Sequence, residues 1–179
     1  RNRQVDGLVV STSQHGVEWL KAIHDSGTPL VLIDRHLGSG TLPAVVADNR
    51  SGGAMLAHHL VEQGYKHPLV LGLSTSHISS VAERIDGFLG VFKEHNLPCV
   101  VREVGFNAIQ ADVDELLLNV KSLPFKPDCL FAVNNNIATA VLHSLAATNV
   151  KIPSDMAVVC FDDLPYFAFI SPTITAIEQ

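Results

Sequence analysis

The chain has 179 residues, of which 47% are hydrophobic and 17% are charged, and this composition excludes a disordered protein and predicts one or two packed units. The net charge of −6 argues against direct binding of nucleic acid through a positively charged surface of this chain. No apolar run approaches the roughly 20 residues of a membrane-spanning helix, so we expect no membrane contact. An odd number of cysteines beside predicted strands favours buried thiols in a reducing cytoplasm over a disulfide framework: Cys99, Cys129 and Cys160.

Apolar runs and helical periodicities alternate along the whole chain. In chain order they predict strands at 5–10, 29–33, 44–47, 68–73, 99–104, 129–133, 157–161 and 173–177. They predict helices at 16–25, 51–63 (capped by Asn49 or Ser51), 81–95, 111–121 and from 134–136 to 147. This order predicts an α/β fold of doubly wound parallel sheets. Only three strands precede Asp48, so we expect the first unit to be incomplete and the chain to begin inside a longer one.

The most informative stretch is the unbroken apolar run from Ala157 to Phe161, which predicts a strand that is covered on both faces. Asp162 and Asp163 follow it directly. In open α/β sheets, ligands bind in the crevice outside the carboxyl ends of the strands, so these carboxylates are candidate ligand contacts. The alternative is that the pair caps a helix or a turn.

Other polar residues also follow predicted strands and would share the same sheet edges: Asp34-Arg35, Asp48-Asn49, 74–77, Asn107 and Asn134-Asn135-Asn136. Loops at such ends are often polar, so the residue types carry the argument. Asp, Asn and Arg side chains offer paired donors and acceptors that suit the vicinal hydroxyls of a sugar. Phe106 offers a flat apolar face for stacking. The asparagine run could instead be a helix cap.

Arg84 opens a predicted helix, where it could either bind a ligand hydroxyl or carboxylate or lie exposed and paired with Glu83 or Asp86. Catalytic signatures are missing: the sequence has no GxSxG elbow, no GxxxxGK[ST] loop and no HExxH pair. We therefore expect no enzyme activity, no cofactor and no metal site.

The stretch Ile152–Asp163 and the segment 171–179 together resemble "IP-D--VVGFDD" and "P-LTTI-Q" of the lactose-repressor (LacI/GalR) family of bacterial transcription regulators. Cys160 stands where that family usually has Gly. The similarity continues through Asp48-Asn49, through 64–67 and through Arg84 with Gly87-Phe88. It extends over nearly the whole chain.

The resemblance implies a periplasmic-binding-protein-like fold of two α/β subdomains with the effector between them. Residues 1–48 would form the incomplete first subdomain, 49–174 the second, and 175–179 a strand that returns to the first. Arg84 and Asp162 match the family's effector-binding arginine and aspartate. Further contacts implied at the cleft are Asn134 (followed by Asn135 in place of the family's Asp), Phe106, Asp34, Arg35 and Ser80.

The resemblance therefore implies the effector-binding domain of a LacI-type regulator that responds to a sugar, a sugar acid or a sugar phosphate. The two arginines, Arg35 and Arg84, favour an anionic sugar. Operator DNA would be bound by a helix-turn-helix headpiece absent from this sequence, in a cytoplasmic homodimer. A periplasmic sugar-binding protein of a transport system is the alternative. A nucleotide-binding enzyme is a third hypothesis, disfavoured because the glycines of a phosphate loop are missing.

Overall fold

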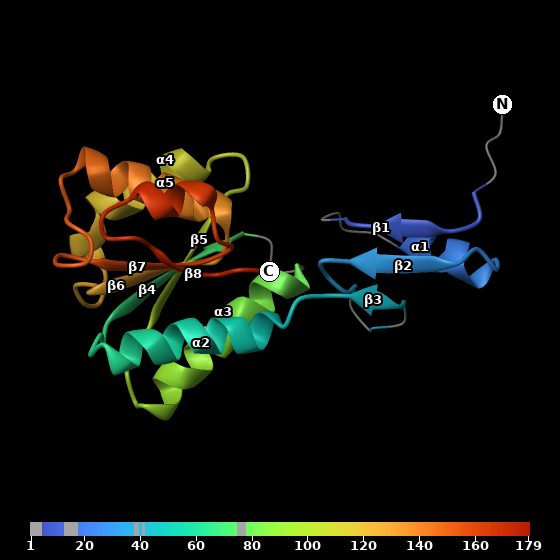
Figure 1. Ribbon diagram of the computed structural model, residues 1–179, viewed down its shortest axis with the longest axis horizontal. Coiled ribbons are helices and arrows are strands. Elements are labelled where there is room, and N and C mark those ends of the chain that lie inside the picture. Colours follow the sequence, from blue (N-terminus) through green and yellow to red (C-terminus); the bar gives the residue numbers. More distant parts are fainter. Residues whose placement is uncertain (1–4, 13–17, 38–39, 41, 75–77) are drawn as a thin grey trace.

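The structure is a computed structural model that describes residues 5–12, 18–37, 40, 42–74 and 78–179, and it contains two parallel sheets (Figure 1). The first sheet has the order β1 (Leu8–Val10), β2 (Leu30–Ile33), β3 (Ala44–Val45). The second has the order β5-β4-β6-β7-β8, with β4 at Pro68–Leu73, β5 at Val100–Val104, β6 at Cys129–Ala132, β7 at Ala157–Phe161 and β8 at Thr175–Ile177. Every pairing is parallel, which confirms the predicted α/β class.

Helices cover the second sheet on both faces. On one side lie α2 (Asn49–Glu62) and α3 (Ser79–Glu94), and on the other lie α4 (Ile109–Leu118) and α5 (Asn135–Ala147) (Figure 1). Because of this double cover, β4, β6 and β7 are buried at every residue and read as continuous apolar runs. We call this unit the second lobe. The first lobe comprises the first sheet and α1 (Glu18–Asp25).

Most predicted elements are present, with shifted ends. The strands predicted at 68–73 and 157–161 are confirmed residue for residue. The cap of α2 is Asp48, whose carboxylate accepts a hydrogen bond from the Ser51 backbone N–H at 3.1 Å, so the prediction of Asn49 or Ser51 as the cap was wrong. Two short 3₁₀ helices, Val120–Ser122 and Pro165–Phe169, were not predicted. Residues 16–17 of the first predicted helix and 75–77 of a predicted polar loop lie outside the described residues.

The last strand differs from its prediction. Residues 175–179 were expected to return to the first subdomain, but β8 pairs with β7 in the second sheet, with Val159 opposite Thr175 and Phe161 opposite Ile177. The reason is packing, because Ala176 and Ile177 contact the large apolar core of the second lobe. The subdomain boundary near residue 48 stays a prediction.

The two lobes differ in how well they are covered. The first lobe has a small core of Leu20, Leu30, Leu32 and Leu42, which lies on the α1 face of its sheet. Residues on the other face alternate with these, and Val9 and Val45 are 71% and 67% exposed there. Among the described residues, therefore, the first sheet buries one face only.

Two glycines bring α2 and α3 into backbone contact. A Cβ atom at Gly53 would lie 2.1 Å from the Arg84 carbonyl oxygen, and one at Gly87 would lie 2.0 Å from the Arg50 carbonyl oxygen. Real side chains never approach so closely, so the crossing requires glycine at both positions. The crossing fixes the backbone of Arg84 against α2.

Replacing Asp128 by asparagine should lower the free energy of unfolding by about 1–2 kcal/mol at pH 7, because its carboxylate accepts charge-assisted hydrogen bonds. The donors are the backbone N–H groups of Lys66 (3.0 Å) and His67 (2.9 Å), which hold the start of β4 beside β6. Burial raises the pKa of Asp128, but the two N–H groups, together with the Cys129 thiol and the His67 side chain, outweigh it and the net pKa is lowered.

The same variant tests pH dependence. A carboxyl group with a lowered folded-state pKa stabilises the protein above its unfolded pKa, about 4, and the effect is lost as pH falls through the folded value. Urea unfolding of wild type and Asp128→Asn should therefore differ at pH 7 and converge at acidic pH. Asp25→Asn, at an exposed position, serves as the control. An equal difference at both pH values would contradict the assignment.

Candidate functional site

Polar residues gather at one edge of the second sheet. Since its strands are parallel, all their carboxyl ends meet there, and the strand order β5-β4-β6-β7-β8 sets the sequence of the residues along the edge. From β5 to β8 the residues that follow the strands are Phe106, Ser80 (in the first turn of α3), Asn134, Asp162 and Gln179. The predicted edge is present. That these residues bind a ligand stays a prediction.

Arg84 is the buried centre of this edge, at 4% exposed. Its Nε donates to Asn49 Oδ1 and its Nη1 donates to the Val133 carbonyl oxygen, both at 2.9 Å. The guanidinium also lies 3.8 Å from the centroid of the Phe161 ring, as a cation–π pair. The alternative of an exposed arginine paired with Glu83 or Asp86 was therefore wrong.

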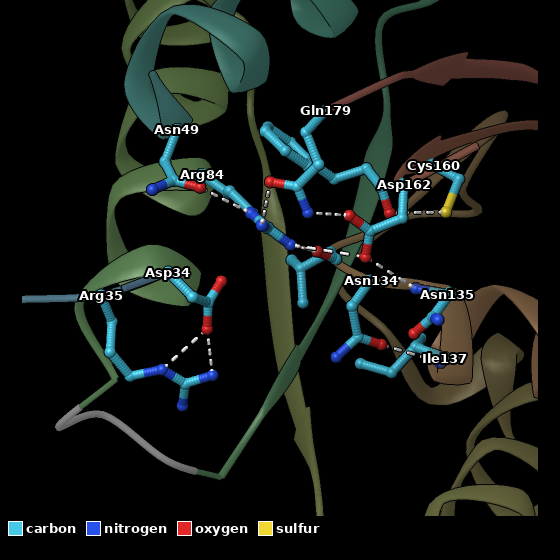
Figure 2. Close-up of polar contacts among 12 residues, drawn as sticks. Asp34, Arg35, Asn49, Arg84, Asn134, Asn135, Ile137, Cys160, Asp162 and Gln179 are labelled. Carbon is cyan, nitrogen blue, oxygen red and sulfur yellow. Dashed lines mark hydrogen bonds and ion pairs between the residues drawn. The ribbon is translucent and has the colours of Figure 1, made fainter. Parts of the chain in front are cut away.

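Asp162 supplies the opposite charge (Figure 2). Its Oδ2 lies 3.7 Å from Arg84 Nη1, and the same oxygen accepts from the Asn135 backbone N–H at 3.4 Å. Burial lowers the pKa of Arg84, and Asp162 opposes that shift, so the guanidinium stays charged. Asp162 also has a left-handed backbone, with φ of 84°, a strained conformation that is enriched at functional sites.

Gln179 joins this pair, and sequence reasoning missed it. Its Nε2 donates to Asp162 Oδ1, and its Oε1 accepts from Arg84 Nη2 at 3.4 Å (Figure 2). The signal in the sequence was weak but present. Gln179 follows the last predicted strand, as the other edge residues follow theirs.

Asn134 is a helix cap. Its Oδ1 accepts from the Ile137 backbone N–H at 3.0 Å, at the start of α5. The capping alternative is thus confirmed for Asn134, through its oxygen. Cys160, which stands where the resembling family has Gly, is fully buried and donates its thiol to the Phe161 carbonyl oxygen at 3.0 Å. Burial raises the pKa of this thiol, which makes it unreactive.

Asp34 and Arg35 come from the first lobe, after β2, and face Arg84 across the site (Figure 2). Arg35 donates from Nε to Asp34 Oδ2 at 2.9 Å and from Nη2 to the same oxygen. Asp34 has a positive φ of 74°, the second left-handed residue at this site. The charge of Arg35 is therefore matched by its own neighbour.

A hydrogen-bonded relay connects the first lobe with Arg84. His36 Nε2 lies 2.6 Å from Glu83 Oε1, and the other Glu83 oxygen accepts from Asn49 Nδ2 at 3.3 Å. Asn49, 1% exposed, in turn accepts from Arg84. Sequence reasoning did not assign this role to His36, Glu83 or Asn49, because their contacts span segments far apart in the chain.

Two predicted residues lie less centrally. The His36 backbone N–H donates to Ser79 Oγ at 3.0 Å, so Ser79 makes this contact between the lobes, while its predicted neighbour Ser80 is buried at 3% exposed. Phe106 is 61% exposed in the turn after β5 and, within the part of the chain that the structure describes, makes no ring contact with Arg84.

A cavity of about 350 Å³ opens beside Asp162 and Gln179. Its lining includes three carboxylates, those of Asp162, Asp163 and Glu178. Within the described ranges, no three potential metal ligands cluster, and no helix is long and apolar enough to cross a bilayer. This edge offers a charged hydrogen-bond donor, the Arg84 guanidinium, and a charged acceptor, the Asp162 carboxylate. Such a pair suits the recognition of a polar molecule.

Comparison with known proteins gives a consistent result. Residues 57–179 match the periplasmic binding protein-like domain family. Over 99% of its length, the chain is 26% identical to the HTH-type transcriptional repressor PurR of Actinobacillus pleuropneumoniae serotype 3, and 27% identical to PurR of Aliivibrio salmonicida. It spans 53% and 54% of these relatives, about half of their length.

Solved structures share the fold. A LacI family transcriptional regulator from Enterococcus faecalis V583, with bound ribose, superposes with a TM-score of 0.82 at 24% identity, covering 99% of this chain and 64% of that one. A LacI family regulator from Mycobacterium smegmatis gives 0.82 at 20% identity, covering 98% and 65%. The chain belongs to the periplasmic binding protein-like domain family.

Proposed function

We propose that the chain binds a neutral sugar as the effector of a LacI-type transcriptional repressor. The observation that carries this proposal is the Arg84–Asp162 pair at the sheet edge, 3.7 Å apart and beside a cavity. A sugar hydroxyl can accept from the guanidinium and donate to the carboxylate at once. The similar regulator from Enterococcus faecalis binds ribose, and the PurR relatives are repressors, which favours regulation over transport.

Charge favours a neutral sugar over the predicted anionic one. Arg35 is bonded to Asp34 and Arg84 lies beside Asp162, so the four charges sum to zero. The cavity lining adds Asp163 and Glu178, which would repel a carboxylate or phosphate. Sugar acids and sugar phosphates are therefore the less favoured effectors.

The effector would act through the angle between the lobes. A sugar held by Arg84 and Asp162 in the second lobe and by Asp34 or Arg35 in the first would favour one relative orientation of the two. This orientation would be transmitted to a helix-turn-helix headpiece outside this chain, in a cytoplasmic homodimer that binds operator DNA. Among the described residues, His36, Ser79 and Glu83 make the polar contact that such a movement would change.

A thermal-shift screen of the full-length protein tests the proposal. A ligand that binds only the native state stabilises it by about 2.7 kcal/mol at a hundredfold excess over Kd. Pairs that differ only in charge should be compared, such as D-ribose with D-ribonate and D-glucose with D-glucuronate, alongside sugar phosphates and purines. We expect stabilisation by a neutral sugar. Stabilisation by acids, phosphates or purines alone would overturn the ligand class, and no stabilisation by any compound would overturn the proposal.

A further inference from the structure

We infer that Glu83 is a positioning residue, which makes the effector affinity of Arg84 depend on how the two lobes are arranged. The inference rests on the proposed function and deepens it, because it names the side chain through which lobe arrangement and effector binding would be coupled. Glu83 would act through Asn49 rather than by touching the effector.

The first argument is the position of the Glu83 carboxylate between the lobes. Its Oε1 lies 2.6 Å from Nε2 of His36 in the first lobe, and its Oε2 accepts from Nδ2 of Asn49 in the second lobe at 3.3 Å. One carboxylate thus contacts both lobes, with one oxygen for each. A change in the angle between the lobes would move His36, and Glu83 would either follow it or lose that contact.

The second argument is that the Asn49 amide satisfies its neighbours in one orientation only. Its Nδ2 donates to Glu83 and to the Ala47 carbonyl oxygen (3.1 Å), and its Oδ1 accepts from Arg84 Nε at 2.9 Å. A flipped amide would set its oxygen against two acceptors and its NH₂ group against the guanidinium. Because Asn49 is buried, such unmet contacts are costly, so Glu83 helps to fix the acceptor that orients Arg84.

The third argument is that Asn49 also contacts the connection between the lobes. Residues 46–48 join β3 of the first lobe to α2 of the second, and Ala47 lies in the middle of them. Both the backbone N–H and Nδ2 of Asn49 donate to the Ala47 carbonyl oxygen, at 2.8 Å and 3.1 Å. A rotation of the lobes would change the backbone angles of such a connection. Asn49 therefore responds to lobe arrangement through both Glu83 and Ala47, and it contacts Arg84 directly.

The test is the affinity of the full-length protein and its variants for D-ribose, or for the neutral sugar that stabilises it best, by isothermal titration calorimetry. His36→Ala should weaken binding by about 3- to 5-fold, because it removes a polar contact between the lobes. Glu83→Ala should weaken it by about 5- to 20-fold, because Asn49 also loses an acceptor and Arg84 must then be ordered as the sugar binds. The double variant should bind like Glu83→Ala, within about twofold, because both substitutions break the same link.

Glu83→Gln separates positioning from charge. Its side-chain oxygen can accept from Asn49 while its NH₂ group donates to the neutral ring of His36, so both contacts survive and affinity should stay within about threefold of wild type. Asp86→Ala is the matched control, since its carboxylate lies on the same helix and pairs with Arg50 of α2 at 3.0 Å. It should leave affinity unchanged. Urea unfolding of each variant reports whether it is folded.

Independent effects of His36→Ala and Glu83→Ala, which multiply in the double variant, would overturn the inference. Wild-type affinity of Glu83→Ala would overturn it too, and so would equal losses in Glu83→Gln and Glu83→Ala. In each of these cases, sugar binding by wild type leaves the proposed function intact. If no neutral sugar binds wild type, the proposed function fails and the inference with it.

Discussion

Asp162→Ala is expected to abolish effector binding, with a loss of affinity of at least about 100-fold. The substitution removes the acceptor for the sugar hydroxyl and the anion beside Arg84. It also leaves a guanidinium that is 4% exposed without its counter-charge, and an uncompensated buried charge is costly. Because Asn49, Val133 and Phe161 still contact Arg84, the fold should survive, with a loss of about 3–5 kcal/mol in the free energy of unfolding.

Calorimetric titration with the sugar found in the thermal-shift screen measures this effect, and urea unfolding of the same samples reports stability. Asp86→Ala is a suitable control, because Asp86 lies on the same helix as Arg84 but forms an exposed ion pair with Arg50 at 3.0 Å. It should change affinity by less than about threefold and stability by less than about 1 kcal/mol. Wild-type affinity in a folded Asp162→Ala protein would remove Asp162 from the site.

Gly53→Ala is expected to destabilise the protein by about 1–2 kcal/mol net. The new Cβ would lie 2.1 Å from the backbone oxygen of Arg84, and no rotamer change can relieve a contact with backbone, so the two helices must move apart. Overpacking of this kind costs about 1–3 kcal/mol and occasionally more, against a gain of about 1 kcal/mol from the better helix propensity of alanine.

Gly90 provides the control for this prediction. It lies on α3, and a Cβ there would meet no heavy atom within 4 Å. Gly90→Ala should therefore stabilise the protein by about 0.5–1 kcal/mol through helix propensity alone. Combining Gly53→Ala with Gly87→Ala should cost less than the sum of the two, because one separation of the helices relieves both contacts. Equal effects at Gly53 and Gly90 would contradict the close crossing.

The sequence predicts the parts of the fold that local patterns determine. β4 and β7 were placed residue for residue, because a strand covered on both faces leaves an unbroken apolar run. The start of α2 was misplaced because Asp48, Asn49 and Ser51 are all good caps and only the backbone geometry selects one. The partner of β8 was missed for a related reason, since a short strand carries no local signal of which sheet it joins.

The site was predictable in its residue types and less so in its contacts. Asp162 was predicted from its position after a buried strand. For Arg84, the neighbouring residues in the sequence also allowed an exposed ion pair, and only the resemblance to the LacI/GalR motif favoured a place in the site. The roles of Gln179 and Glu83 depend on contacts across 95 and 47 residues of sequence, which no local pattern encodes. The anionic effector stays a prediction, and it was made without the ion pair between the adjacent residues Asp34 and Arg35, where Asp34 has a left-handed backbone.

The weak contact between His36 and Glu83 implies that little free energy would be needed to shift the two lobes from one arrangement to another. The pair is polar, with side chains 38% and 26% exposed, and such a contact contributes at most about 1 kcal/mol. It can bias two arrangements of the lobes by no more than about fivefold. An effector that prefers one arrangement by about 2.6 kcal/mol would invert a population from one in ten to nine in ten. That preference is smaller than the whole binding free energy of a millimolar ligand, about 4.1 kcal/mol, so a metabolite at ordinary cellular abundance would suffice.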